Sequence, residues 1–350
     1  MSKCSYKLFA DCIPVRGYQR SIIYDIRRCE FKFIPNDLYD ILLKNSLLEL
    51  SKIQKDYNIN AQNIIKDYID FLITNEFIFS CKKATAKYFK NIDVNYESPY
   101  LINNVIMELD SNSYYDLPQF FEDIEHVGCV DLQIKIFDAQ TVNRINNILS
   151  YTLNKRIKSI ELIIPYTESF VVQENIFSLL KDHLRITSIV IYNTPKEHIN
   201  YLEKQFLNRF SKIVFCTDMI NNSQHCGFVS SVYFTVNLPF FMESKLFNNC
   251  LNKKLAIDTQ GNIKNCTALN KIYGNLKDGN LIQIISSPEF QRLWKIKKDE
   301  ISVCKDCEFR YMCSDCRAFT ENDDLYGKPK HCHYNPYDMK WDDSRYEIFS

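Results

Sequence analysis

The chain has 350 residues, and its 43 Lys and Arg residues balance 43 Asp and Glu residues. A formal charge of zero excludes a general attraction to nucleic acids or anionic membranes, so neither is expected as a partner. Hydrophobic residues make up 46% of the chain, which excludes disorder and suffices for two or three domains with buried cores. None of its seven glycines forms a GxGxxG or GxxxxGK motif, so the common phosphate-binding loops are absent.

The N-terminus carries no apolar segment of signal-peptide length, and no run of about 18 apolar residues could cross a bilayer. We therefore expect a cytoplasmic protein. In a reducing compartment, clustered cysteines bind metal or carry out redox chemistry more often than they form disulfides.

The first 80 residues predict a small domain of strands and helices. Alternating apolar residues indicate three short strands before residue 35, which form an antiparallel sheet. Pro35, Asn36 and Asp37 then offer a helix cap, and three helical segments follow, the last over residues 60–77. Strand character returns at residues 77–80. This order predicts a winged-helix-like domain over residues 1–90.

Between residues 100 and 240, apolar β-branched runs alternate with amphipathic segments. Buried parallel strands joined by helices produce this pattern, which is typical of an α/β fold. We expect a partial (β/α)6 barrel with six strands, at residues 103–109, 130–137, 159–166, 186–193, 212–216 and 231–236.

The 14 cysteines are unevenly distributed, with seven before residue 250 and seven within residues 250–332. The second set has the order Cys-x10-Gly-x4-Cys, Cys-x2-Cys-x5-Cys-x2-Cys and a last Cys, at Cys250, Cys266, Cys304, Cys307, Cys313, Cys316 and Cys332. A CxxC turn points both sulfurs at one metal site and frees backbone N–H groups to hydrogen-bond them. Zinc and iron–sulfur clusters both take four thiolates, so the spacing leaves the metal open. Because apolar periodicity fades after residue 240, metal ligation is expected to stabilise residues 241–350.

The cysteine order, together with Gly261, resembles the SPASM domain at the C-terminus of radical S-adenosylmethionine peptide maturases, and the similarity covers about residues 240–340. One departure is the last spacing of the cluster, x2 here and usually x3. The resemblance implies two auxiliary [4Fe-4S] clusters in a cysteine-rich C-terminal domain.

The same resemblance implies a ligand set for each cluster. One cluster would be held by Cys304, Cys307, Cys313 and Cys332. The other would take three ligands, from Cys250, Cys266 and Cys316. Its fourth ligand is not evident in the pattern, and the candidates are Cys226, an open site, a water or a substrate thiol.

In these relatives a partial barrel precedes the SPASM domain, and CxxxCxxC follows its first strand. The three thiolates of that motif leave one iron open to bind S-adenosylmethionine. Here the strand at residues 103–109 continues into Asp-Ser-Asn-Ser-Tyr-Tyr without a cysteine, and the second strand ends without a GGE-like motif. We therefore expect a degenerate barrel that does not use S-adenosylmethionine, and no catalytic residue is assigned.

Residues 5–80 resemble the RiPP recognition element, a winged-helix domain that binds the leader of a ribosomally made precursor peptide as an added strand. The resemblance implies that strand Glu30–Ile34 is the binding edge. Possible floor residues are Phe31, Phe33, Tyr68 and Phe71. Each of these side chains is equally suited to a hydrophobic core.

The whole arrangement resembles the SPASM-domain protein of grasp-with-spasm systems, which is encoded with an ATP-grasp ligase and a short precursor peptide. It implies a peptide maturation protein whose partners are the precursor and the ligase. Two alternatives stay open, an active iron–sulfur redox enzyme that modifies the peptide and a zinc-stabilised interaction scaffold.

Overall fold

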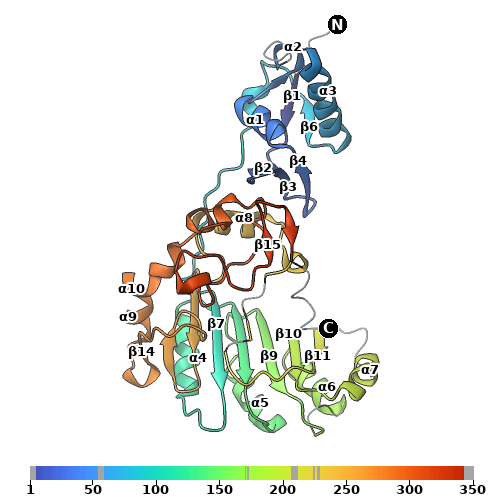
Figure 1. Ribbon diagram of the computed structural model, residues 1–350. Coiled ribbons are helices and arrows are strands. Elements are labelled where there is room, and N and C mark those ends of the chain that lie inside the picture. Colours follow the sequence, from blue (N-terminus) through green and yellow to red (C-terminus); the bar gives the residue numbers. More distant parts are fainter. Residues whose placement is uncertain are drawn as a thin grey trace. The chain divides into compact units, whose positions relative to one another are not determined.

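The computed structural model describes residues 5–53, 59–169, 171, 173–205, 212–223, 225–226 and 229–342. The chain divides into two compact units, which are shown in Figure 1. Unit 1 comprises Met1–Tyr96, Gly227–Asn249 and Ile296–Ser350, and unit 2 comprises Glu97–Cys226 and Cys250–Lys295. The two units thus interleave along the chain, and the three predicted domains stay a prediction.

Unit 1 begins with two small antiparallel sheets. One has the order β5 (Leu48–Glu49), β1 (Ser5–Leu8), β6 (Ile78–Ser80), and the other has the order β2 (Cys12–Arg16), β3 (Ser21–Asp25), β4 (Glu30–Ile34). The first predicted strand therefore contains two strands of different sheets. A turn interrupts it, closed by a hydrogen bond from Cys12 N to Phe9 O (3.1 Å).

The helices of unit 1 occupy the three predicted helical segments and one further segment, as α1 (Asn36–Lys44), α2 (Leu50–Ile53), α3 (Ile59–Thr74) and α8 (Leu238–Leu246). The cysteine-rich part of this unit contains short turns and the pair β15 (Tyr334–Asn335) and β16 (Lys340–Trp341). The winged-helix assignment stays a prediction.

The central strand β3 is buried at all five positions because hydrophobic cores cover both faces of its sheet. Ile23 packs with residues of α1 and α3 on one face. On the other face Tyr24 packs with Phe241, Phe309 and Tyr334. Side chains alternate between the faces of a strand, so the N-terminal sheet is a layer between its own helices and the cysteine-rich segment.

Unit 2 is built on one eight-stranded sheet of order β11-β10-β9-β8-β7-β12-β13-β14. Its parallel strands are β7 (Asn104–Leu109), β8 (Asp131–Ile136), β9 (Ser159–Pro165), β10 (Ile186–Tyr192), β11 (Lys212–Phe215) and β12 (Lys254–Ile257), and the antiparallel β13 (Asn262–Lys264) and β14 (Gly274–Asn275) extend one edge. Five of the six predicted strands are confirmed. The partial-barrel description stays a prediction.

The sixth predicted strand, at residues 231–236, is wrong. Ser231–Tyr233 forms a single 3-10 turn in unit 1, capped by Ser230. Two apolar side chains there are not buried, since Val232 is 80% and Tyr233 64% exposed, whereas Val236 packs into a core of unit 1. The sixth parallel strand is β12, which pairs with β7. Its four residues are too short a run to stand out in the sequence.

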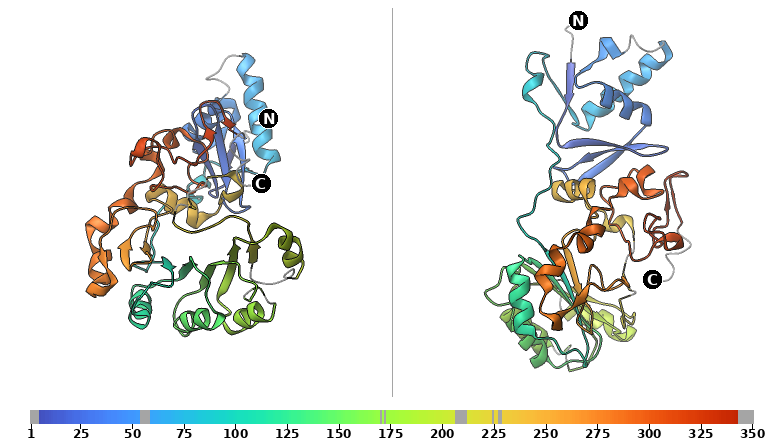
Figure 2. Two further views of the ribbon diagram at one scale, coloured as in Figure 1. Left: turned by 60° about the horizontal axis from the view of Figure 1, so that its bottom comes forward. Right: turned by 90° about the vertical axis from the view of Figure 1, so that its left-hand side faces the viewer.

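The helices that connect the parallel strands are α4 (Leu117–His126), α5 (Val142–Ser150), α6 (Gln173–Asp182) and α7 (Lys196–Gln205). Two further helices, α9 (Leu281–Ser286) and α10 (Pro288–Gln291), follow β14. Figure 2 shows α4, α5 and α6 on the same side of the sheet. None of the described helices is both long and apolar enough to span a membrane.

Polar side chains recur on one face of this sheet. On β8, Gln133 and Lys135 alternate with apolar residues, and their partners across the strands are Glu161 and Glu108. A parallel sheet covered on both faces by helices is normally apolar throughout. The face that carries these groups is therefore suited to polar contacts.

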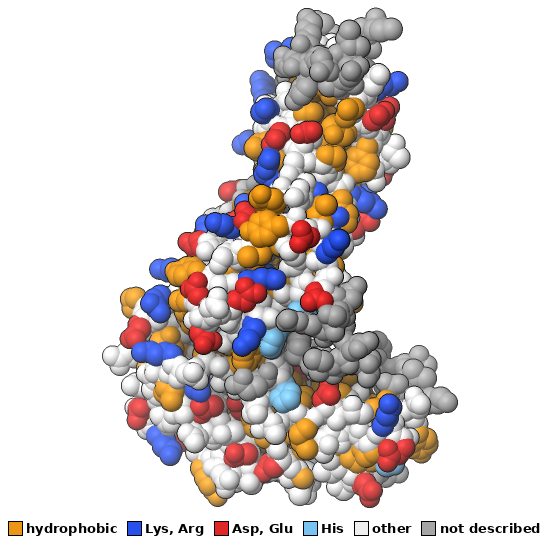
Figure 3. Space-filling view, in the orientation of Figure 1, with side chains coloured by type: hydrophobic (Ala, Val, Ile, Leu, Met, Phe, Trp, Pro, Cys, Tyr) orange, Lys and Arg blue, Asp and Glu red, His pale blue; other side chains and the backbone are white. Residues whose placement is uncertain are grey.

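The surface shown in Figure 3 has interspersed acidic and basic side chains, as the zero net charge predicts.

Candidate functional site

Four of the predicted cysteines line a single cavity in unit 1, Cys304, Cys307, Cys313 and Cys332. A 3-10 turn, Cys304–Asp306, begins the first CxxC segment, and Cys307 N donates to Cys304 O at 3.0 Å. Val303 precedes this 3-10 turn and has φ 66°. It is the central residue of a γ-turn, which is closed by a hydrogen bond from Cys304 N to Ser302 O at 2.7 Å. A β-branched residue in this γ-turn is strained, and such strain clusters at functional sites.

In this cavity the four thiols lie beside three basic side chains. Burial raises the pKa of the Cys304 thiol to about 12, although Lys298 partly offsets this. Burial also lowers the pKa of Lys298, but the adjacent Cys313, Cys304 and Asp315 outweigh it and raise that pKa above its usual range. Arg310 also lines the cavity. A metal-bound thiol is deprotonated, so these thiols become ligands only when a positively charged metal centre stabilises their thiolate form.

A buried carboxylate lies directly beside Cys307. Glu308 accepts hydrogen bonds from Arg20 Nε at 2.8 Å and from the Tyr334 hydroxyl at 2.6 Å. Arg20 follows β2 in the N-terminal sheet and Tyr334 begins β15. The Glu308 carboxylate therefore links the N-terminal sheet to the cysteine-rich segment by hydrogen bonds. Sequence reasoning missed this contact, because its partners are 288 residues apart.

A second group of thiols lies in unit 2. Cys250 precedes β12 and accepts a hydrogen bond from Lys254 Nζ at 3.5 Å. Cys266 follows β13 and is hydrogen-bonded to Cys226. That hydrogen bond, together with Lys254, outweighs burial and lowers the pKa of Cys266 to about 6. Lys254, four residues after a predicted ligand, is another residue that the sequence analysis did not single out.

The hairpin between β12 and β13 explains the glycine of the cysteine pattern. Gly261 has φ +81°, a conformation that L side chains rarely adopt, and its N–H donates to Asp258 O at 2.9 Å. A Cβ there would lie 3.3 Å from Asn275 Oδ1. The turn therefore requires glycine, and it places Cys266 at the end of the returning strand.

Cys316 is buried in unit 1, whereas Cys250 and Cys266 belong to unit 2. Its association with those two thiols stays a prediction. In the described part of the chain, no three thiol, imidazole or carboxylate side chains are placed to hold one metal ion. A [4Fe-4S] cluster does not need such a group, since each of its irons takes one thiolate.

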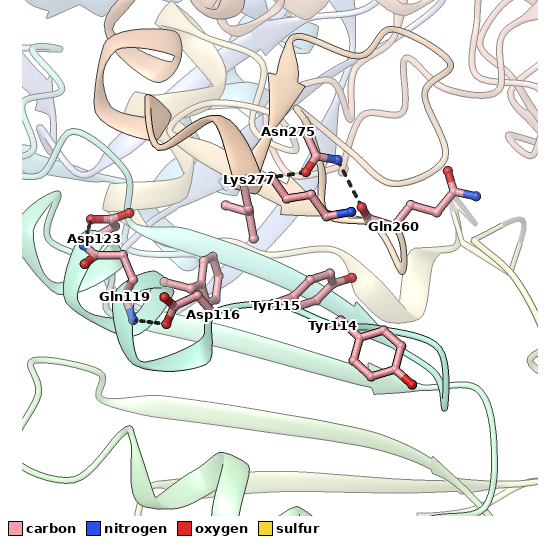
Figure 4. Close-up of a pocket in the computed structure, with 11 residues that line it drawn as sticks. Tyr114, Tyr115, Asp116, Gln119, Asp123, Gln260, Asn275 and Lys277 are labelled. Atoms are coloured by element: carbon pink, nitrogen blue, oxygen red, sulfur yellow. Dashed lines mark hydrogen bonds between the residues drawn. The ribbon is translucent and has the colours of Figure 1, made fainter.

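The loop after β7, where the sequence has no CxxxCxxC motif, is held by hydrogen bonds. Ser113 Oγ donates to Thr259 O at 2.9 Å, and the Tyr115 hydroxyl donates to Glu108 O at 2.8 Å. A small pocket lies at this loop, and Figure 4 shows Tyr115 and Asp116 across from Asn275 in its wall. The loop is thus tied to the β12–β13 turn by oxygen and nitrogen groups, with no thiol among its residues.

The four predicted peptide-binding residues are not brought together. Phe31 and Phe33 lie on the face of β4 that contacts the cysteine-rich segment, with ring centroids 5.7 and 5.9 Å from that of Phe309. Tyr68 and Phe71 are partly buried and pack against the core on the other face. As predicted, β4 is an edge strand, since β3 is its neighbour in the sheet and β2 lies at the opposite edge.

Two comparisons bear on this arrangement. The comparison with curated proteins gives no match. Residues 249–308 match the family model of SPASM, an iron-sulfur cluster-binding domain. The matched stretch includes Cys250, Gly261, Cys266, Cys304 and Cys307. Residues 249–308 of this chain are therefore similar to an iron–sulfur cluster-binding domain.

Proposed function

We propose that this chain is a maturation protein for a ribosomally made peptide. It holds two [4Fe-4S] clusters, binds the leader of the precursor, and works with an ATP-grasp ligase without cleaving S-adenosylmethionine. The observation that carries the proposal is the SPASM match combined with two separate groups of thiols. The absence of CxxxCxxC from the sequence supports a role in which the ligase performs the chemistry.

The donor chemistry of unit 1 fits an iron–sulfur cluster. Four cysteine thiolates around a [4Fe-4S] core leave a net negative charge, and Lys298, Arg310 and Lys328 in the cavity wall offset it. Cys304, Cys307, Cys313 and Cys332 would hold this cluster. The cluster would supply structural stability and, where its potential allows, electron transfer.

In unit 2, Cys250 and Cys266 would contribute to the second cluster, with Cys316 as the third predicted ligand. Here Lys254 donates to the Cys250 sulfur, and hydrogen bonds to cluster sulfurs tune the reduction potential.

Replacing Lys254 by methionine is expected to make the potential of this cluster more negative, because removing a positive charge disfavours an added electron. The measurement is a potentiometric titration followed by EPR. Lys264→Met is the matched control, since Lys264 is already paired with Asp258 at 3.1 Å. Equal shifts in both variants, or none, would contradict the role assigned to Lys254.

The leader peptide is assigned to the free edge of β4. The opposite edge strand, β2, carries Pro14 at its centre, which cannot donate a hydrogen bond to an added strand. β4 has no proline and presents Phe33, which is 44% exposed. Phe31 and Phe33 contact Phe309, which lies between Cys307 and Cys313. A peptide on this edge would therefore bind close to the segment that carries the first cluster.

A titration of the full-length protein with the cognate precursor peptide tests this assignment. Wild type is expected to bind at micromolar concentration or below. Phe33→Ala is expected to weaken binding by about tenfold, the loss of about 1.4 kcal/mol of apolar contact. The control is Leu184→Ala, which removes an 86% exposed side chain from unit 2. No binding by wild type, or an equal loss in both variants, would contradict the assignment.

An anaerobic assay with S-adenosylmethionine and a reductant separates the proposal from the redox-enzyme alternative. We expect no 5′-deoxyadenosine and no mass change in the precursor, since the loop after β7 has no thiol to hold a site-differentiated iron. A mass change in the precursor with this protein alone would favour the alternative.

A further inference from the structure

Three thiols from distant positions in the sequence converge within unit 2. Cys250 and Cys266 flank the β12–β13 hairpin, whereas Cys226 comes from the segment after β11. Cys226 is a hydrogen-bond partner of Cys266, and Lys254 donates to Cys250 at 3.5 Å. The charge of Lys254 interacts with all three sulfurs. The cysteine pattern of the C-terminal domain does not include Cys226, so this proximity is visible only in the folded chain.

The neighbourhood of Cys226 differs from that of the other upstream cysteines of unit 2. Cys129 is fully buried. The sulfurs of Cys129 and Cys226 each donate to a backbone carbonyl, Asp131 O at 3.4 Å and Ser223 O at 3.5 Å, so this bond does not distinguish them. Cys216 follows β11, and burial raises its pKa. Cys226 is only half-buried and adjoins a predicted ligand beside a lysine. It is therefore placed to become a thiolate ligand, whereas packing accounts for Cys129 and Cys216.

We propose that Cys226 is a ligand of the same iron–sulfur cluster as Cys250 and Cys266. This inference rests on the proposed function. It assigns the open fourth position of that cluster to a residue of this chain, in place of a water or a substrate thiol. Three thiolates near one lysine would repel one another, and Lys254, which interacts with all three, offsets one charge. The positive charge of the iron–sulfur core would offset the negative charges of the other thiolates, which are the usual ligands of such clusters.

Thiol alkylation read out by mass spectrometry tests the proposal on the full-length protein. The protein is loaded anaerobically with iron and sulfide, and half of the sample is then stripped with an iron chelator under reducing conditions. Both halves are treated with iodoacetamide. We expect Cys226, Cys250 and Cys266 to be protected in the loaded sample and labelled after stripping. Cys29, which is exposed, is expected to be labelled in both and serves as an internal control.

A pair of variants gives a second readout. Cys226→Ser is expected to lower iron and sulfide retained after gel filtration, or to leave one iron of the second cluster with an open position that an added thiol binds. Cys216→Ser is the matched control and is expected to retain the wild-type content. Circular dichroism of both variants shows whether either has lost its fold.

The outcomes separate the inference from the function on which it rests. Labelling of Cys226 in the loaded protein, with Cys250 and Cys266 protected, overturns the inference and leaves the proposed function standing. Retention of wild-type iron by Cys226→Ser, with no iron that binds an added thiol, also overturns it. A protein that takes up no iron at all contradicts the proposed function itself.

Discussion

Replacing Cys307 by alanine is expected to remove the iron and sulfide of one cluster and to lower the thermal unfolding midpoint sharply. The segment around Cys307 consists of 3-10 turns with little regular structure, so ligation is a main source of its stability. Metal binding energy is folding energy in a site that is not preformed in the unfolded chain. Iron and acid-labile sulfide per chain, with a thermal melt under anaerobic conditions, give the measurement.

The control for this variant is Cys29→Ala, which changes an exposed cysteine in the turn between β3 and β4. Its iron content and unfolding midpoint are expected to match those of wild type. If Cys307→Ala keeps the full iron content, the ligand assignment in unit 1 is wrong.

Replacing Arg20 by methionine is expected to destabilise unit 1 by about 3–5 kcal/mol, since it leaves the carboxylate of Glu308 buried without its cation. The two side chains are 2.8 Å apart, with 28% of Arg20 and 1% of Glu308 exposed. Arg20 also stacks over Phe33, with 3.5 Å between its guanidinium carbon and the ring centroid. Denaturant unfolding of the iron-loaded protein measures the loss.

The double variant Arg20→Met with Glu308→Gln separates charge burial from lost packing. Glutamine keeps an oxygen to accept the Tyr334 hydroxyl bond at the position of Glu308 but carries no charge. We expect it to recover most of the stability lost in Arg20→Met. If the double variant is as unstable as the single one, the buried charge is not the cause.

Local patterns were enough to predict much of the fold. The predicted strand at residues 103–109 corresponds to β7, and α1 begins at Asn36, where a helix start was predicted, although no side chain caps it. Such elements are readable because apolar periodicity is a local property of the sequence. The β12 strand was missed since its burial depends on pairing with β7, about 150 residues earlier in the chain.

The candidate site likewise has parts that local sequence motifs predict and parts that depend on packing of distant segments. The CxxC spacing at Cys304 and Cys307 is a local motif, and both thiols line the cavity of unit 1. The grouping of Cys332 with them came from the family resemblance, since no spacing links it to that motif. The contact of Glu308 with Arg20, and the approach of Cys226 to Cys266, arise only when distant segments pack together. Neither hydrophobic periodicity nor cysteine spacing predicts contacts between segments so far apart in the sequence.

The metal content of the full-length protein tests the central claim most directly. The protein is purified anaerobically, and its iron, acid-labile sulfide and zinc are quantified together with its absorption spectrum. We predict iron and sulfide in equal amounts in a brown protein, as [4Fe-4S] clusters require. Tetrahedral zinc without sulfide would contradict the account and identify the cysteine-rich segment as a structural zinc scaffold.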